Sequence, residues 1–204
     1  MNKTEAAMHV ARSELILGGQ KSGKSRRAEL LARQWLGADP THRAVLIATA
    51  QAWDEEMQQR IARHQSDRAE RVPGMLTVEE PLALAQAISR CSRADTLVVV
   101  DCLTLWLTNC LMPADEQASG TMGRNRDMAH VERVRVAPLL IAIEEAAGPI
   151  VLVGNEIGLG VIPMGAQVRA FVDALGQLNQ NVAAACQRVT LMAAGLPLTL
   201  KDSQ

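Results

Sequence analysis

The sequence predicts an α/β domain in which helices cover both faces of a mostly parallel β-sheet. Short apolar runs alternate along the chain with longer segments of helical periodicity, which is the pattern of βαβ units. Two of the runs, 96–100 and 150–153, contain no charged residue, as expected for strands buried on both faces. The chain has 204 residues, enough for a single domain with a substantial core.

The predicted strands are apolar runs that end at glycine or at polar residues. The first run, 14–17, is short, but Gly18 and Gly19 mark its end clearly. The last two runs could close the sheet. In chain order, the predicted strands are residues 14–17, 44–49, 96–101, 150–153, 189–193 and 196–200.

The predicted helices carry apolar residues three and four positions apart. Ala28, Leu31 and Ala32 have this spacing in the first helix, which Gly37 ends. Pro138 is expected to kink or divide the fifth helix, because proline removes a backbone donor from a helix interior. The predicted helices are residues 24–36, 54–65, 82–92, 103–111, 130–147 and 165–186, with a charged loop at 67–74 and a flexible insertion at 113–127.

Composition and charge exclude several classes of protein. The formal net charge is −1 and the isoelectric point is near 6.4, so bulk attraction to nucleic acid or to an anionic membrane is not expected. One Phe, three Trp and no Tyr are too few for a base-stacking surface. No apolar run approaches the ~20 residues of a transmembrane helix, and no signal-peptide core is found.

Cysteine usage and the first residues complete the domain prediction. The four cysteines lack C-x-x-C spacing, which favours reduced thiols in the cytoplasm over a zinc or redox motif. We therefore expect a cytoplasmic protein with an N-terminal leader, residues 1–13, and one domain, residues 14–204.

A glycine-rich segment follows the first predicted strand and precedes the first predicted helix. It fits the phosphate-loop pattern G-x-x-x-x-G-K-[ST] and consists of Gly18, Gly19, Gln20, Lys21, Ser22, Gly23, Lys24 and Ser25. Glycines let the backbone turn its N–H groups toward phosphate oxygens, and the following helix presents its positive N-terminus to the same anion. Lys24 is expected to reach the β- and γ-phosphates as a catalytic residue, and Ser25 to bind Mg²⁺. The alternative, a chance glycine turn, would not explain the flanking strand and helix.

An acidic residue at the end of a neighbouring strand usually completes such a magnesium site. Asp101 ends the run 96–101 and is the predicted metal partner of Ser25. Its alternative role is to cap the helix that begins near residue 103. Together these residues predict a single P-loop NTPase-like domain.

Asn155 and Glu156 directly follow the predicted strand 150–153, so they also lie at the ligand edge of the sheet. Contact with substrate or metal and capping of a helix remain open as alternatives. Gly158 and Gly160 suggest a tight loop that lets another group approach closely.

Further sequence motifs follow the phosphate loop along the chain. Residues Asp54 to His64 read D-x-E-M-x-x-R-I-x-x-H. The other segments are 48–50, 77–81, 100–109, 155–163 and 169–180. With these motifs at these intervals, the chain resembles the bifunctional adenosylcobinamide kinase / adenosylcobinamide-phosphate guanylyltransferase family of cobalamin biosynthesis, over about residues 14–200.

The resemblance implies an enzyme with two successive activities. A nucleoside triphosphate first phosphorylates the hydroxyl of adenosylcobinamide, with ATP and GTP as the expected nucleotide substrates. GTP then donates GMP to adenosylcobinamide phosphate through a guanylylated histidine, which falls on His64 as the second catalytic residue. A neutral imidazole is a competent nucleophile near pH 7. Without the resemblance, His64 would be interpreted as an exposed side chain on a polar helix.

The same resemblance implies a guanine-nucleotide site, small-molecule substrates and a homo-oligomer, by resemblance a trimer. Arg68 is the natural phosphate clamp, because a guanidinium group binds phosphate oxygens in a bidentate manner. Besides the phosphate loop, the residues implied in this site are Ala48, Thr49, Ala50, Gln65, Ser66, Asp67, Arg68, Glu79 and Asp101.

The chain departs from the family pattern at a few positions. Lys21 stands where the family usually carries Arg, so one phosphate contact loses its bidentate geometry. Met75 stands where the family often has Trp, and the segment 64–77 is longer than in some relatives, which affects the placement of Glu79. Two rival interpretations are a kinase for another small molecule and a noncatalytic nucleotide-dependent switch.

Overall fold

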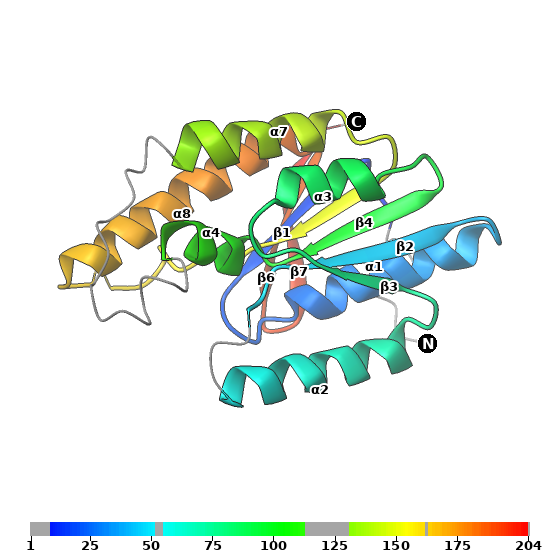
Figure 1. The fold of residues 1–204 in the computed structure, drawn as a ribbon, viewed down its shortest axis with the longest axis horizontal. Helices are drawn as coiled ribbons and strands as arrows, with labels where there is room; N and C mark the ends of the chain where they lie inside the picture. Colours follow the sequence, from blue (N-terminus) through cyan, green and yellow to red (C-terminus); the bar gives the residue numbers. More distant parts are fainter. Residues whose placement is uncertain (1–8, 52–54, 113–130, 162, 204) are drawn as a thin grey trace.

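A seven-stranded sheet forms the centre of the computed structural model (Figure 1), with strand order β3-β2-β4-β5-β1-β6-β7. The structure describes residues 9–51, 55–112, 131–161 and 163–203. Neighbouring strands are parallel except for the antiparallel pair β6 and β7, which confirms the predicted mostly parallel sheet. The strands are β1 Ser13–Gly18, β2 Arg43–Ala48, β3 Leu76–Glu79, β4 Thr96–Asp101, β5 Ile150–Val153, β6 Arg188–Ala193 and β7 Leu196–Asp202.

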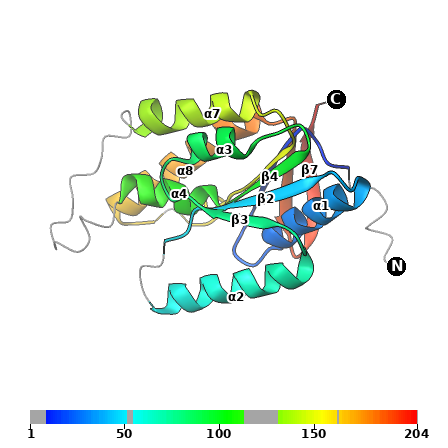
Figure 2. The ribbon, with the colours of Figure 1, turned by 45° about the vertical axis from the view of Figure 1, so that its right-hand side comes forward.

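Helices lie on both faces of this sheet. On one face are α3, α4, α7 and α8, and on the other are α1 and α2 (Figures 1 and 2). The helices are α1 Lys24–Ala38, α2 Glu55–Arg71, α3 Leu84–Cys91, α4 Leu103–Leu111, the π-helical segment η1 Glu132–Val136, α7 Ala137–Glu144 and α8 Ala166–Ala185.

Each face of the sheet has its own apolar core, because successive side chains of a strand point to opposite faces. In β4, Val98 and Val100 belong to the cluster beneath α3, α4, α7 and α8, together with the buried Trp106. Leu97 and Val99 belong to the cluster beneath α1. The continuous apolar runs of the sequence are therefore explained by burial on both sides.

Three element predictions need correction. Strand β3 was not predicted, because it is a short edge strand with mostly exposed side chains and no apolar run. Helix α2 continues to Arg71, so the charged loop predicted at 67–74 was wrong over its first residues. Strand β1 begins at Ser13, one residue inside the predicted leader, and Ser13 is already buried.

The helix predicted at 130–147 is continuous over 131–144 but changes from π-helical to α-helical form next to Pro138. A π-helical segment precedes α7, and Pro138 lies at the first turn of α7, where the missing backbone donor costs least. The flexible insertion predicted at 113–127 lies outside the described residues.

The parallel arrangement brings several predicted site segments to one edge of the sheet. The carboxyl ends of β1, β2, β4 and β5 lie side by side in the strand order, which is where open α/β sheets bind ligands. The C-terminal hairpin reaches the same edge. Its turn residues Ala194 and Gly195 have φ values of 51° and 79°, and the Gly195 N–H donates to the Ser22 carbonyl at 3.0 Å.

Candidate functional site

The phosphate loop lies between the end of β1 and the start of α1, as predicted. Gly18 has a φ of 152° and Gly23 a φ of 103°, a region that side chains rarely enter. A Cβ added to Gly18 would lie 2.5 Å from the Met192 carbonyl oxygen, so no larger residue fits. The two glycines therefore let the chain turn sharply against β6 and enter α1.

Lys24 is nearly buried within this loop. It is 9% exposed, and its ammonium donates to the Gly19 carbonyl oxygen at 2.7 Å. Burial lowers the pKa of Lys24 below its ordinary value, while Cys102 and Asp101 oppose this shift. The Lys24 ammonium is therefore close enough to Asp101 for the two charges to interact across the carboxyl edge of the sheet.

A small pocket brings the predicted metal residues together with Arg68. Its polar lining consists of Ser25, Glu29, Arg68 and Asp101, contributed by α1, α2 and β4. Arg68 is 8% exposed and donates to the Thr77 hydroxyl at 3.4 Å. A guanidinium group is suited to bind phosphate oxygens, and the two carboxylates beside it are suited to bind a cation.

The pocket offers the hard oxygen ligands that Mg²⁺ prefers. Ser25 supplies a hydroxyl and Asp101 a carboxylate, and proteins usually bind Mg²⁺ through one or two carboxylates together with substrate phosphates. Among the described residues, no group of three or more His, Cys, Asp or Glu could hold a metal ion. One hydroxyl and one carboxylate leave further coordination positions open for water and for nucleotide phosphates. These donors therefore fit a magnesium ion that is bound together with a nucleotide.

The side chain of Thr49 makes buried hydrogen bonds to the protein backbone. It is wholly buried, and its hydroxyl donates to the Cys102 carbonyl at 2.8 Å and accepts from the Cys102 N–H at 2.9 Å. Its own N–H donates to the Asp101 carbonyl at 3.1 Å. The flanking Ala48 and Ala50 are half-buried. The side chain of Thr49 is thus engaged with the chain that follows β4.

The backbone of Glu156 is bonded to the phosphate loop, and that of Asn155 to α4. The Glu156 N–H donates to the Gly18 carbonyl at 3.1 Å, and the Asn155 N–H donates to the Thr104 hydroxyl at 2.9 Å. Helix α8 starts only at Ala166, so the helix-capping interpretation was wrong. Glu156 instead accepts from the Gly158 N–H at 2.7 Å, which closes a short turn.

The described contacts of the helix that carries His64 lie in its carboxyl-terminal part. Arg71 forms an ion pair with Glu29 of α1 at 3.2 Å, and Arg68 and the following Val72 are buried. In Figure 2, α2 lies at the bottom of the view, below β3 and α1. The backbone of His64 lies in α2, whereas its side chain lies outside the part of the chain that the structure describes.

The remaining predicted residues lie around the same edge. Glu79 ends β3 and pairs with Ala48 in the sheet, which places it beside the end of β2. Gln65 and Ser66 are exposed on α2, and Asp67 accepts from Arg71 at 3.3 Å. The structure thus gathers the phosphate loop, Arg68, Glu79 and Asp101 at one edge of the sheet.

Two buried asparagines at this edge were not predicted. Asn109 donates to the carbonyls of Thr49 and Pro81 at 2.8 and 3.1 Å, and Asn179 donates to the Asn155 carbonyl at 3.1 Å. Asn109 stands in an otherwise apolar stretch of α4. A lone amide in such a stretch is the signal that could have identified it, since buried polar groups need partners.

Comparisons with known proteins agree with this geometry. The sequence model of the family described as "Cobinamide kinase / cobinamide phosphate guanyltransferase" matches residues 14–200. The protein named bifunctional adenosylcobalamin biosynthesis protein CobP, from Pseudomonas aeruginosa, is 46% identical over 188 residues, which are 92% of this chain and 96% of that protein.

Two enterobacterial relatives match over the same share of this chain, at lower identity. The proteins named bifunctional adenosylcobalamin biosynthesis protein CobU are 31% identical over 187 residues in Escherichia coli and 32% identical over 190 residues in Salmonella typhimurium. In both cases the match covers 92% of this chain and 98% of the relative. Within the described residues, no helix is both long and apolar enough to cross a membrane.

The family resemblance predicted from the motifs is thereby confirmed over nearly the whole chain. It agrees with a mostly parallel sheet whose phosphate loop follows its first strand. The chain belongs to the cobinamide kinase / cobinamide phosphate guanyltransferase family, and is an enzyme of cobalamin biosynthesis with kinase and nucleotidyltransferase activities.

Proposed function

We propose that this enzyme phosphorylates adenosylcobinamide with a nucleoside triphosphate and then transfers GMP from GTP to the product through a guanylylated His64. The observation that carries the proposal is the pocket in which Ser25, Asp101 and Arg68 lie together. Lys24 directly precedes Ser25 in the chain, and the helix that bears His64 also supplies Arg68. A phosphate-binding site and the predicted nucleophile thus belong to adjoining elements.

The kinase step relies on position and charge. The phosphate-loop N–H groups and Lys24 would hold the β- and γ-phosphates, and the substrate hydroxyl would attack the γ-phosphorus in line. Ser25 and Asp101 would hold Mg²⁺, which offsets the negative charge of the phosphates when it is bound. The low exposure of Lys24 strengthens its interaction with phosphate, because little water screens the charge.

In the transfer step, an imidazole nitrogen of His64 would attack the α-phosphorus of GTP. A P–N bond forms, the bond between the α-phosphorus and the bridging oxygen breaks, and pyrophosphate leaves. A phosphate oxygen of adenosylcobinamide phosphate then attacks the same phosphorus, breaks the P–N bond and releases the imidazole. Two displacements thus replace one difficult one, and Arg68, which lines the pocket with Ser25 and Asp101, would bind phosphate oxygens.

The way in which α2 is held supports this assignment. Among its described side chains, Arg71 pairs with Glu29 of α1 and Arg68 donates to Thr77 of β3, both near its carboxyl end. His64 lies one helical turn before Arg68. Residue 64 therefore belongs to the same stretch of α2 as Arg68, which lines the pocket.

The test is covalent labelling with GTP that carries ³²P at the α-position. The wild-type protein is expected to retain label that is labile in acid and stable in alkali, as a phosphoramidate is, and His64→Ala is expected to retain none. His42→Ala is the matched control, because His42 stacks on Trp35 away from the carboxyl edge. Absence of label in the wild type, or equal label in His64→Ala, would contradict the transfer mechanism.

The oligomeric state also belongs to this proposal. Strand β7 is an edge strand, and Leu196, Leu198 and Leu200 are 65%, 57% and 57% exposed. Leu196 and Leu198 share one face of the strand, and with the exposed Leu200 they form an apolar edge of the kind that marks subunit contacts. We propose that copies of the chain associate there, as a trimer. Light scattering is expected to report a trimer for the wild type and a smaller species for Leu198→Lys.

We propose a cytoplasmic location for the protein from the state of its cysteines. All four cysteines are thiols rather than disulfides, as expected for a protein of the reducing cytoplasm. The proposed partners are the small molecules adenosylcobinamide and adenosylcobinamide phosphate, with no nucleic acid.

A further inference from the structure

Buried hydrogen bonds join the segments that follow three neighbouring strands. Asn109 of α4 donates through Nδ2 to the Thr49 carbonyl at 2.8 Å and to the Pro81 carbonyl at 3.1 Å. The Thr49 hydroxyl donates to the Cys102 carbonyl and accepts from the Cys102 N–H. Asn109 is 2% exposed and Thr49 0% exposed, so water does not compete for these groups.

These bonds fix the backbone that directly follows the Asp101 side chain. The Thr49 N–H donates to the Asp101 carbonyl at 3.1 Å, and the Thr49 hydroxyl holds both polar groups of the Cys102 backbone. The direction of a side chain is set by the backbone that bears it. Thr49 therefore determines where the Asp101 carboxylate lies relative to Ser25 in the pocket.

Asn109 in turn determines where Thr49 lies. Thr49 is followed by the segment that leads to α2, so its carbonyl would otherwise have no fixed direction. The Asn109 amide holds that carbonyl and also the Pro81 carbonyl. Because Asn109 uses both amide hydrogens in these bonds, it can keep the loops after β2 and β3 in one register with α4.

We infer that Asn109 and Thr49 are positioning residues that act together to hold the Asp101 carboxylate opposite Ser25. This inference rests on the proposed role of Ser25 and Asp101 in binding a magnesium nucleotide. It gives Thr49 a role through Asp101 rather than through contact with the nucleotide, and it assigns Asn109 to the site. Partners that orient a metal ligand typically change metal affinity by about 10–100-fold when they are removed.

The test measures nucleotide binding without any turnover. The dissociation constant of a fluorescent ATP analogue is measured in EDTA and in saturating Mg²⁺, and the ratio of the two values reports how strongly Mg²⁺ assists binding. In Thr49→Val and Asn109→Asp the ratio is expected to fall about tenfold. In Thr49→Ser, which keeps the hydroxyl, it is expected to stay near the wild-type ratio.

Controls separate positioning from general loss of stability. Thr108→Val removes a neighbouring hydroxyl of α4 that donates only to the Thr104 carbonyl at 2.9 Å within the same helix, and its ratio is expected to equal that of the wild type. Thermal unfolding of each variant shows whether it is folded. If Thr49→Val does not fold, Asn109→Asp, which preserves size and shape, carries the test.

The outcomes distinguish this inference from the proposed function. A wild-type ratio in folded Thr49→Val or Asn109→Asp, while Asp101→Asn lowers it, would overturn the inference alone. A wild-type ratio in Asp101→Asn would overturn both the proposed role of Asp101 and the inference that rests on it. A lowered ratio in Asp101→Asn, Thr49→Val and Asn109→Asp, with Thr49→Ser unchanged, supports both.

Discussion

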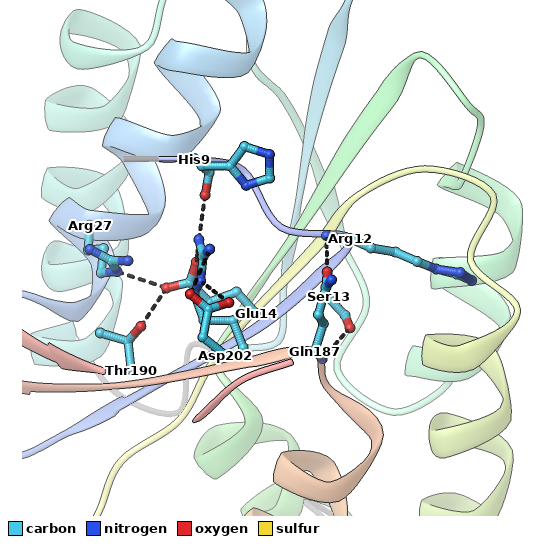
Figure 3. Close-up of polar contacts among 9 residues, drawn as sticks. His9, Arg12, Ser13, Glu14, Arg27, Gln187, Thr190 and Asp202 are labelled. Atoms are coloured by element: carbon cyan, nitrogen blue, oxygen red, sulfur yellow. Dashed lines mark hydrogen bonds and ion pairs between the residues drawn. The ribbon is translucent and has the colours of Figure 1, made fainter. Parts of the chain in front are cut away.

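The carboxylate of Glu14, wholly buried at the start of β1, accepts from the Nε of Arg27 in α1 at 2.8 Å (Figure 3). The same carboxylate oxygen accepts from the Thr190 hydroxyl at 2.8 Å. Arg188 lies 3.8 Å from its other oxygen and also pairs with Asp202. The helix that begins with Lys24 and Ser25 is thus tied to the sheet by a buried ion pair one turn into the helix.

Removing the charge of Glu14 is expected to weaken the whole fold. Glu14→Gln should lower the free energy of unfolding by about 3 kcal/mol, because the largely buried Arg27 guanidinium loses the charge of its Glu14 partner. The double variant Glu14→Leu with Arg27→Met should lose less than the single variant, since no charge remains unpaired. Urea unfolding measures both, and a Glu14→Gln protein as stable as the wild type would contradict this account.

Lys24→Met is expected to separate stability from activity. Burial of the ammonium lowers the pKa of Lys24, so the charged form costs folding free energy that Met does not. The variant should therefore be at least as stable as the wild type at pH 7, and phosphoryl transfer should fall about 100-fold.

The difference in stability between Lys24→Met and the wild type is expected to change with pH in one direction. In the wild type, the folded state releases the Lys24 proton at lower pH than the unfolded state does, so wild-type stability rises as the pH increases from the folded pKa toward the unfolded value. The advantage of Lys24→Met should therefore shrink on going from pH 7 to pH 10 in urea unfolding experiments. A growing advantage would be inconsistent with a lowered pKa.

The turn between β6 and β7 is expected to affect the phosphate loop. Gly195 has a φ of 79°, so Gly195→Ala should cost about 1 kcal/mol of stability and disturb the bond to the Ser22 carbonyl. The KM for the nucleotide should then rise several-fold. Gly176→Ala is the control, because Gly176 lies inside α8 with open space around its Cα. This change should stabilise the protein by about 0.5–1 kcal/mol and leave the KM unchanged.

Arg68 and Arg71 provide a matched pair on one helix. Arg68 is buried in the pocket, whereas the Arg71 side chain is 43% exposed and pairs with Glu29. Arg68→Lys should slow labelling by α-³²P-GTP at least about tenfold, because lysine keeps the charge but loses the bidentate geometry. Arg71→Lys should label nearly as fast as the wild type, since exposed ion pairs contribute little. Equal rates for the two variants would refute the phosphate role of Arg68.

Local patterns were sufficient where the structure depends on neighbouring residues in the chain. The spacing of Gly18, Gly23 and Lys24 determines a loop whose geometry is built from its own backbone. The apolar runs of β4 and β5 predict burial on both faces, and the sheet confirms it. Strand β3 escaped prediction because an exposed edge strand needs no apolar side chains; its pairing with β2 comes from backbone groups alone.

The sequence by itself determined the phosphate loop, the mostly parallel sheet and the family, because each of these depends on residue types at fixed local spacing. Only the tertiary structure decided the partners of Glu14, Thr49 and Asn109. Their hydrogen bonds reach across 13 to 176 positions of the chain, and such contacts exist only once strand order brings β2, β4 and the C-terminal hairpin to their places. A buried polar side chain must find a partner, but which partner it finds is a property of the packed molecule.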